Sequence, residues 1–377
     1  MAIKKILEEL ETLGLIRCRE GEDRKKGSVG RKAVSYELNE SCHYTVGIHI
    51  NRFATSVGLL DMSGNILFKK QRSMREEPQS QRAFVEQIAA DVFETIKQAG
   101  GDRGKILGIG VGVPGPVDTE HGIVLTPPNI QVLRYLPLKE ILERRTGLPV
   151  YVQKDTNVIA FGEYWHGQSE EVSDLTYIDA DMGIGSGMVI AGMIKEGANG
   201  MAGEFGHITI DPDGPLCNCG NRGCLEAMSS GIAILKEMEA QSGQNCSHPL
   251  HGKKERTDIE DVFELAEKQD VTAISVLNRS AFYMGIAVCN LINIWDPQKI
   301  ILGGILVQRY PRYFSIVKDV VASRRLKGAK ESGMELSALG ENAGMIGAGE
   351  VVADHFFNEM VNEVFDRNGE ASREKKL

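Results

Sequence analysis

The sequence predicts an α/β fold built from two similar lobes. Three strand-like segments followed by a helical segment occur twice, first from Tyr44 and again from Leu175. These segments are rich in β-branched residues and are bounded by Gly, Asn and Asp, which is typical of strands. The chain has 377 residues, too many for one ordinary core. The sequence therefore indicates a duplicated α/β lobe, and we expect a small ligand to bind in the cleft between the lobes.

Residues 1–40 differ in character from the rest and are expected to form a separate module. Apolar residues recur at helical spacing up to Leu13, and Gly14 ends the helix. Two strand-like segments then enclose a charged loop, which is the pattern of the second half of a winged helix. The basic residues of this loop are candidates for contacts with DNA phosphates: Arg24, Lys25, Lys26, Arg31 and Lys32.

Two interpretations of this loop stand side by side on the residues alone. A run of charges is usually only a solvated surface, and Glu20, Glu22 and Asp23 dilute the positive charge. A helix-turn-helix also needs a scaffold helix ahead of the recognition helix, for which Met1 leaves no room. We therefore expect any DNA-binding module here to be incomplete.

The two lobes are assigned from the order of their elements. The first lobe covers residues 41–155 and takes in a closing helix at about 341–366. The second lobe covers residues 156–340 and contains a metal-binding loop. The tail at 368–377 is charged and is expected to be disordered. The elements expected within the lobes are strands at 44–50, 55–61, 66–73, 106–114, 149–155, 175–180, 188–197, 207–210 and 299–305, and helices at 81–98, 138–146, 273–295 and 345–365.

One imidazole and three thiols are concentrated in a loop rich in Gly, Pro, Asp and Asn. They are His207, Cys217, Cys219 and Cys224. Zinc prefers four nitrogen or sulfur ligands in tetrahedral geometry, and a closed set of this kind is structural rather than hydrolytic. The alternative is a group of unrelated thiols or a redox pair. The short spacing and the intervening glycines favour zinc.

Composition and charge limit the classes of protein. The formal net charge of −9 argues against a nucleic-acid-binding surface over the whole chain, but not against a local one. No segment approaches the ~20 continuous apolar residues of a membrane span. The N-terminal segment is a charged amphipathic helix rather than a signal peptide, and the remaining cysteines are scattered. We therefore expect a cytoplasmic protein without membrane association.

The metal loop, together with V-G-V-P-G-P-V-D and G-E-F-G-H, closely resembles the ROK family of repressors, open reading frames and sugar kinases. The resemblance runs from about Tyr44 to about Glu350 and implies a two-lobed actin-like ATPase (ribonuclease H-like) fold. The N-terminal segment resembles the end of the winged-helix domain of the family's repressors, which favours a truncated DNA-binding remnant there. The site residues that the resemblance implies for a sugar are Gly115, Asn129, Asp155, Glu204, His207 and Glu226, with His207 also binding the zinc.

Several positions depart from the pattern of the family's kinases. The segment His49–Phe53 stands where the kinases have D-x-G-x-T, and Asp181–Gly185 reads D-M-G-I-G in place of G-T-G-x-G. Arg52 and Phe53 are expected to fill the phosphate space, and Asp181 to repel a phosphate. Ile305, which follows Gly303-Gly304, departs from the family's adenosine-binding motif. We therefore expect no kinase activity, with Asp155 acting as a sugar ligand instead of a general base.

Lys154 replaces an asparagine that the family usually places before the aspartate. Lysine only donates hydrogen bonds and carries a charge. Two explanations stay open: a ligand that differs from plain glucose, or an ion pair with Asp155 or a neighbour.

These features predict a sugar-responsive repressor that binds a monosaccharide in a zinc-braced cleft. The resemblance further implies a homodimer or homotetramer and a DNA operator, whose binding the truncation would weaken or abolish. The alternatives are an ATP-dependent sugar kinase and a sugar-binding protein without a DNA role.

Overall fold

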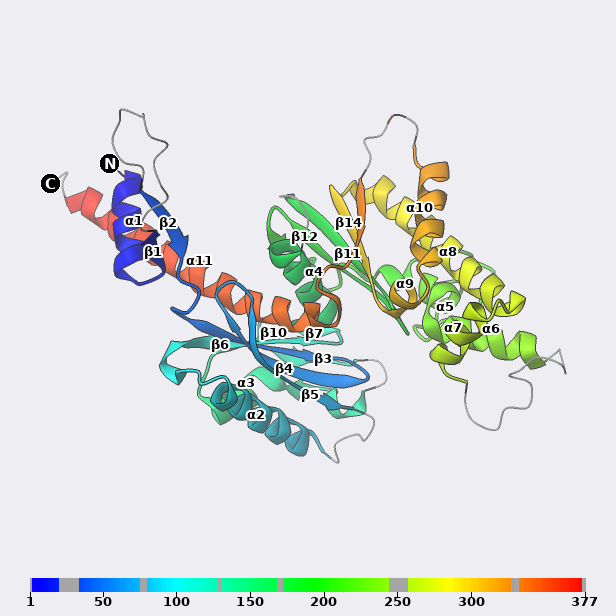
Figure 1. Ribbon diagram of the computed structural model, residues 1–377, viewed down its shortest axis with the longest axis horizontal. Coiled ribbons are helices and arrows are strands. Elements are labelled where there is room, and N and C mark those ends of the chain that lie inside the picture. Colours follow the sequence, from blue (N-terminus) through cyan, green and yellow to red (C-terminus); the bar gives the residue numbers. More distant parts are fainter. Residues whose placement is uncertain are drawn as a thin grey trace. The chain divides into compact units, whose positions relative to one another are not determined.

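The computed structural model describes residues 2–19, 34–74, 80–127, 130–167, 172–243, 257–326, 328 and 332–374, the last thirteen of these as backbone alone. The described chain divides into two compact units. Unit 1 comprises residues 1–158 and 344–377, and unit 2 comprises residues 159–343. The fold is α/β, with one five-stranded mixed sheet in each unit (Figure 1).

The sheet of unit 1 has the strand order β10-β6-β3-β4-β5. Strands β3, β6 and β10 are parallel, whereas β4 and β5 complete an antiparallel meander. The strands are β3 (Tyr44–Ile50), β4 (Ala54–Asp61), β5 (Ile66–Ser73), β6 (Ile106–Val113) and β10 (Val150–Lys154). Between β6 and β10 the chain forms a small sheet of β7 (Val117–Asp118), β8 (Ile123–Val124) and β9 (Leu136–Pro137).

Helices cover both faces of this sheet (Figure 1). On one face lie α2 (Gln81–Gln98) and α3 (Leu138–Thr146), whose apolar side chains join those of the strands in a single core. On the other face lies α11 (Ala343–Glu374). Glycines of three strands meet it: a Cβ on Gly47 or Gly110 would overlap backbone atoms of α11, and one on Gly58 would overlap the Met345 side chain. The backbone of α11 therefore packs directly against the backbone of the strands.

The N-terminal module contains α1 (Ala2–Thr12) and an antiparallel pair, β1 (Ile16–Arg19) and β2 (Ser35–Leu38). Gly14 has a φ of +74°, which lets the chain turn from the helix into β1. The helix and the two strands follow in the expected order. The winged-helix interpretation stays a prediction, because the expected wing lies outside the described residues.

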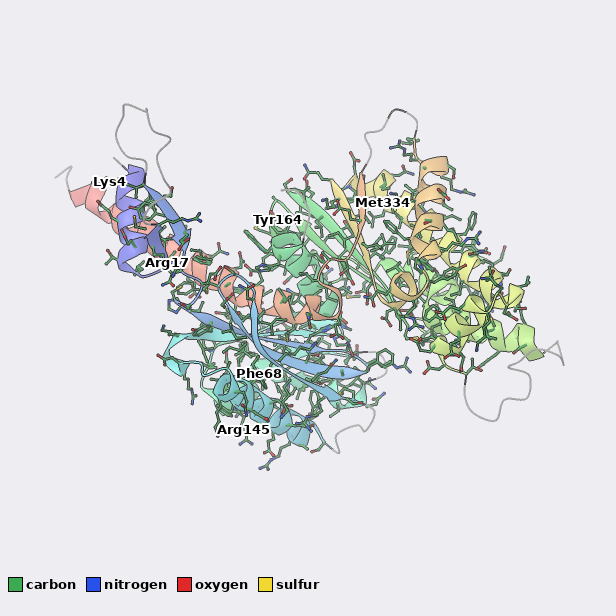
Figure 2. The ribbon with its side chains drawn as sticks, in the orientation of Figure 1. Lys4, Arg17, Phe68, Arg145, Tyr164 and Met334 are labelled. Carbon is green, nitrogen blue, oxygen red and sulfur yellow. The ribbon has the colours of Figure 1, made fainter. Side chains whose placement is uncertain are left out.

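The sheet of unit 2 has the order β13-β12-β11-β14-β15. Its strands are β11 (Asp174–Ala180), β12 (Ile184–Ile190), β13 (Met193–Ile194), β14 (Lys299–Gly303) and β15 (Gly333–Leu336). Its helices are α4 (Asp155–His166), which begins in unit 1, α5 (Leu225–Ser229), α6 (Gly231–Gly243), α7 (Ile259–Glu267), α8 (Val271–Trp295), α9 (Ile305–Arg309) and α10 (Arg312–Arg324). Figure 2 shows the side chains of both units, with Tyr164 of α4 and Met334 of β15 labelled.

Helix α8 is long and apolar enough to cross a membrane by length and composition. Half of its most apolar window is buried within the protein, and residues such as Leu277, Met284 and Val288 belong to the core of unit 2. Core helices of soluble proteins satisfy the same length and composition criteria. Gly285 allows a close approach to α10, because a Cβ there would lie 2.6 Å from Cβ of Val320. The burial assigns α8 to the core.

Four expected elements differ from the structure. Residues 207–210 do not form a strand: a 3-10 turn, Phe205–His207, is followed by a single bridge between Thr209 and Cys224. The single strand expected at 188–197 is a hairpin, in which the chain turns between β12 and β13, and β13 is the third strand of the second meander. Asp155 is the first residue of α4 rather than the end of a strand. Helix α11 continues to Glu374, past the start of the tail that was expected to be disordered.

Candidate metal centre and sugar site

The metal-binding loop is closed on itself by backbone hydrogen bonds. The amide of Cys217 donates to the carbonyl of Asn221 over 2.8 Å, and the amide of Leu225 donates to the carbonyl of Ile208 over 3.0 Å. Gly223, with a φ of +63°, passes so close to Asp211 that any side chain would overlap its carbonyl oxygen. These contacts bring the two ends of the loop together.

The four predicted metal ligands converge. The ligand atoms of His207, Cys217, Cys219 and Cys224 all lie within 4.8 Å of one another. The Cys217 Sγ lies 3.7 Å from Nδ1 of His207, and the Cys219 Sγ lies 3.6 Å from that of Cys224. A tetrahedral zinc with bonds of ~2.3 Å to sulfur and ~2.0 Å to nitrogen requires ligand separations of about 3.5–3.8 Å. The donor set therefore fits a tetrahedral metal.

The three thiols differ in acidity. Burial raises the pKa of the Cys217 thiol and raises that of Cys224 to about 12. A hydrogen bond from the backbone of Asn221 lowers the pKa of Cys219. Buried thiols with raised pKa values stay protonated unless a nearby positive charge stabilises the thiolate, and zinc supplies such a charge.

Glu226 lies on the first turn of α5, two residues after the predicted ligand Cys224. Its carboxylate accepts a hydrogen bond of 3.2 Å from the amide of Ile184, the first residue of β12. Glu204 precedes the turn that carries His207, and its carbonyl accepts the His207 amide over 3.0 Å. The structure thus places Glu204, His207 and Glu226 on the segments that flank the metal loop. Sequence reasoning did not identify the Ile184 amide, because a backbone donor leaves no trace in residue type.

In unit 1 the predicted sugar residues follow the carboxyl ends of parallel strands. Lys154 ends β10 opposite Val113 of β6, and Asp155 begins α4. A Cβ on Gly115 would lie 3.4 Å from Cγ of Lys154, so the aliphatic part of the lysine runs beside this loop. Lys154 is buried, at 9% exposure. Ligands of open α/β sheets bind at this edge.

Some predicted residues lie outside the described part of the chain. They are the sugar candidate Asn129 and the DNA candidates Arg24, Lys25, Lys26, Arg31 and Lys32. Their roles stay predictions.

The turn that replaces the first phosphate motif is ordered without glycine. The Asn51 side-chain oxygen accepts hydrogen bonds of 2.8 Å from the amides of Phe53 and Ala54. The side chains of Arg52 and Phe53 are exposed, and their filling of the phosphate space stays a prediction. His49, by contrast, is buried at the end of β3.

Asp181 directs its carboxylate into its own unit. The carboxylate oxygens accept hydrogen bonds from the amides of Met182, over 2.5 Å, and Ile305, over 3.3 Å. The charge that was expected to repel a phosphate is therefore partly satisfied by backbone donors.

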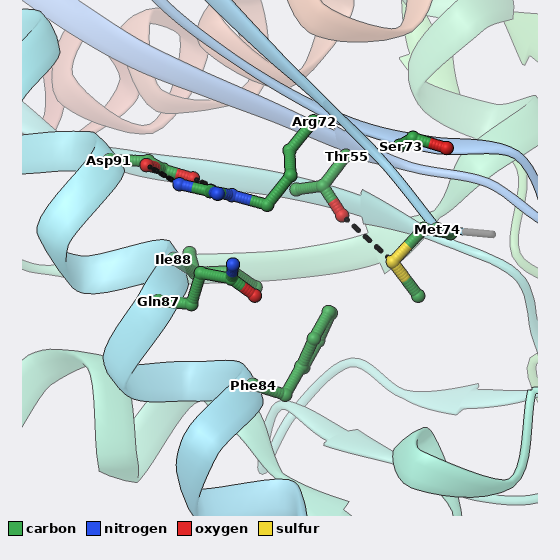
Figure 3. A pocket seen from close by; sticks show the side chains of 8 residues that line it. All are labelled: Thr55, Arg72, Ser73, Met74, Phe84, Gln87, Ile88 and Asp91. Carbon is green, nitrogen blue, oxygen red and sulfur yellow. Dashed lines mark hydrogen bonds and ion pairs between the residues drawn. The ribbon is translucent and has the colours of Figure 1, made fainter. Parts of the chain in front are cut away.

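A cavity of about 160 Å³ lies between β5 and α2 in unit 1 (Figure 3). Arg72 and Asp91 form a two-bond ion pair at one end, over 3.0 and 2.7 Å. The Thr55 hydroxyl lies 3.5 Å from the sulfur of Met74 at the other end. None of the predicted sugar or metal residues lines this cavity.

Comparison with known proteins decides the family. Residues 45–355 match the ROK family. The chain belongs to the ROK family. The xylose repressor of Bacillus subtilis is 30% identical over 334 residues, which cover 88% of this chain and 83% of the repressor. The glucokinase of Halalkalibacterium halodurans is 32% identical over 322 residues, covering 83% of this chain and 96% of the kinase.

A solved structure of a ROK transcriptional regulator, a homologue of Escherichia coli Mlc, is also similar. Its TM-score is 0.76 at 28% identity, and the match covers 93% of this chain and 87% of that chain. The fold is thereby the actin-like ATPase fold of ROK proteins, as the sequence predicts.

The expectation that the chain is not an enzyme is wrong. A ROK glucokinase aligned over nearly its whole length at 32% identity indicates kinase activity positively. The expectation depended on His49–Phe53 and Asp181–Gly185. In the structure, Arg52 and Phe53 are exposed and the Asp181 carboxylate already accepts hydrogen bonds from two backbone amides, so these replacements do not by themselves exclude a phosphate.

Proposed function

We propose that this ROK protein is a cytoplasmic, sugar-responsive transcriptional regulator that binds a monosaccharide through polar groups carried by both units. The observation that carries the proposal is the N-terminal module. The ROK match starts at residue 45, and residues 45–377 are 333 of the 377 residues. A match covering 93% of the chain must therefore include part of residues 1–44, and the regulator's structure gives such a match.

The candidate metal cluster of unit 2 and the carboxylates beside it support the proposal. We propose that His207, Cys217, Cys219 and Cys224 hold one structural zinc, which has four protein ligands and no open position. The ion would fix the His207 ring, whose second nitrogen then faces a sugar hydroxyl. The Glu204 and Glu226 carboxylates accept hydroxyl protons, which suits a polyol. Asp155, Lys154, Gly115 and Asn129 supply the contacts from unit 1.

The first test measures sugar binding and DNA binding together. D-Xylose, D-glucose and amino-sugars are screened by thermal shift, because a ligand that binds only the native state raises the melting temperature. Binding to DNA flanking the protein's own gene is then measured by fluorescence anisotropy with and without each sugar that binds. The proposal expects salt-sensitive specific binding that a sugar weakens. Binding that no sugar alters would refute it.

Phosphorylation of a sugar by ATP is the second candidate, favoured by the glucokinase match. Asp155, at the start of α4, would then be the general base that accepts the hydroxyl proton. A coupled assay of ADP release over a hexose panel tests this activity. Turnover that Asp155→Asn abolishes establishes it, and no turnover above the rate without sugar excludes it. The two functions are compatible in one chain, and a homodimeric or homotetrameric assembly would suit the regulator.

A further inference from the structure

His49 occupies a confined position beside a predicted sugar ligand. It is the sixth residue of β3, with 9% exposure, opposite Gly112 of β6. Burial lowers the pKa of its imidazole, and the nearby Asp155 carboxylate partly opposes this effect. The ring also lies beside the first turn of α4, which begins at Asp155, because a Cβ on Gly112 would lie 2.4 Å from Cγ2 of Val158 and 3.6 Å from Cδ2 of His49.

Two glycines leave room for the imidazole ring. A Cβ on Gly344, in the first turn of α11, would lie 2.5–2.7 Å from Cγ, Cδ2 and Nδ1 of His49. A Cβ on Gly112 would lie 3.6 Å from Cδ2. Real Cβ atoms essentially never approach within 3.0 Å, so the ring fills space that only glycine at 344 leaves open. The imidazole is therefore packed directly against the start of α11.

Helix α11 is well placed to carry such a movement. Its early turns lie on the glycines of β3, β4 and β6, and its later residues lie near the start of β3. Phe356 packs against His43, with ring centroids 5.2 Å apart, and His355 stacks on Tyr151 at 4.1 Å. The first turn of α11 thus contacts His49 of β3, and Phe356, near the middle of the helix, contacts His43, which directly precedes β3.

His43 belongs to a linker, residues 39–43, that is hydrogen-bonded to its neighbours on both sides. The Asn39 amide donates to the Leu15 carbonyl over 2.9 Å, and the Asn39 side chain donates to the Gly14 carbonyl over 2.8 Å. The Glu40 carbonyl accepts the amide of Met62 over 3.1 Å. These contacts join the N-terminal module to the sheet of unit 1 and make the linker an ordered connection.

We propose that His49 is a positioning residue that couples the ligand state of Asp155 to helix α11, and through Phe356 and His43 to the N-terminal module. The inference rests on the proposed sugar-responsive function. A ligand that donates hydrogen bonds to Asp155 weakens the field of the carboxylate at the imidazole without removing its charge. The ring then shifts against Gly344, which moves α11 and the linker together. Coupling between distant sites requires an element with two packing arrangements, and we assign that role to the contact between His49 and Gly344.

The test uses hydrogen exchange, which needs neither DNA nor turnover. Backbone exchange at residues 35–43 is measured with and without a saturating sugar, D-xylose or D-glucose, for the wild-type chain, Gly344→Ala, His49→Gln and Gly349→Ala. The last variant is the matched control: a Cβ at 349, also on α11, would lie 2.8 Å from Leu60 and Thr45 and nowhere near His49.

The expected result is a change in linker exchange of about 5-fold or more on sugar binding in the wild type and in Gly349→Ala. Gly344→Ala should bind the sugar and lose this change. His49→Gln, which keeps a neutral hydrogen-bonding side chain, should retain part of it and provides the test if Gly344→Ala does not fold. A full response in Gly344→Ala, an equal loss in Gly349→Ala, or a wild type that binds sugar without any linker response would overturn the inference. The last outcome leaves sugar binding intact, whereas a wild type that binds no sugar removes the proposed function itself.

Discussion

Gly223 allows a test of the proposed metal site at a residue that is not itself a metal ligand. An alanine there would place its Cβ inside the van der Waals radius of the Asp211 carbonyl oxygen. Since non-bonded carbon and oxygen atoms prefer a separation of about 3.5 Å, the backbone must move by more than ~1 Å. Metal ligands tolerate only about 0.2 Å of displacement, and Cys224 is the next residue. The left-handed backbone adds roughly 1–2 kcal/mol of strain.

Gly223→Ala should therefore lose the proposed zinc, from about one ion per chain to a small fraction. The matched control is Gly220→Ala. Gly220 also has a positive φ, of +95°, but a Cβ there meets nothing within 4 Å. This variant therefore has the same kind of backbone strain without the steric overlap. Zinc is measured by elemental analysis after gel filtration, and sugar affinity by calorimetry. Full zinc content in Gly223→Ala would refute the reasoning, as would equal loss in both variants.

Three further predictions concern stability and are checked by urea denaturation. Asp91→Asn should lower the free energy of unfolding by about 2 kcal/mol, because the buried carboxylate pairs with Arg72 and Lys70, which are themselves partly exposed; no loss would contradict this. These cations hold the pKa of Asp91 below its usual range, against its burial. The stabilisation is thus complete above the ordinary carboxyl pKa and disappears as the pH falls through the lowered one, so Asp91→Asn should show a flatter acid limb than the wild type. Tyr313→Phe should lower the free energy of unfolding by about 1–3 kcal/mol, because the Tyr313 hydroxyl lies 3.0 and 3.1 Å from the buried hydroxyls of Ser229 and Ser280. Tyr310→Phe, which removes a hydroxyl from a partly exposed tyrosine, should lower it less.

Much of the fold follows from local sequence signals. The bounds of α2 and α3 agree with the expected helices, because each has apolar residues at helical spacing and a clear end, Gly147 with φ +67° closing α3. The segment 207–210 was misassigned for a physical reason. Its alternating pattern is that of a strand, but the loop contacts around Gly223 decide its conformation, and these depend on residues far along the sequence.

The sequence predicts which side chains form the candidate metal site, but not the backbone groups and distant residues that contact the neighbouring positions. The metal ligands converge as their spacing indicates, since residue type and spacing define such a set. His49 was interpreted only as a lost carboxylate, and its contact with Gly344 joins residues almost 300 positions apart. The inward orientation of Asp181 depends on the amide of Ile305, which residue type does not reveal.

The burial of α8 has a practical consequence for work with fragments. In the intact chain α10 covers this helix where Gly285 meets Val320. A fragment ending before Arg312 would lack that cover and present to solvent a helix apolar enough to insert into a bilayer. Such a fragment should aggregate or adhere to membranes and chaperones in the cell. Deletion studies of unit 2 should therefore keep α8 and α10 together.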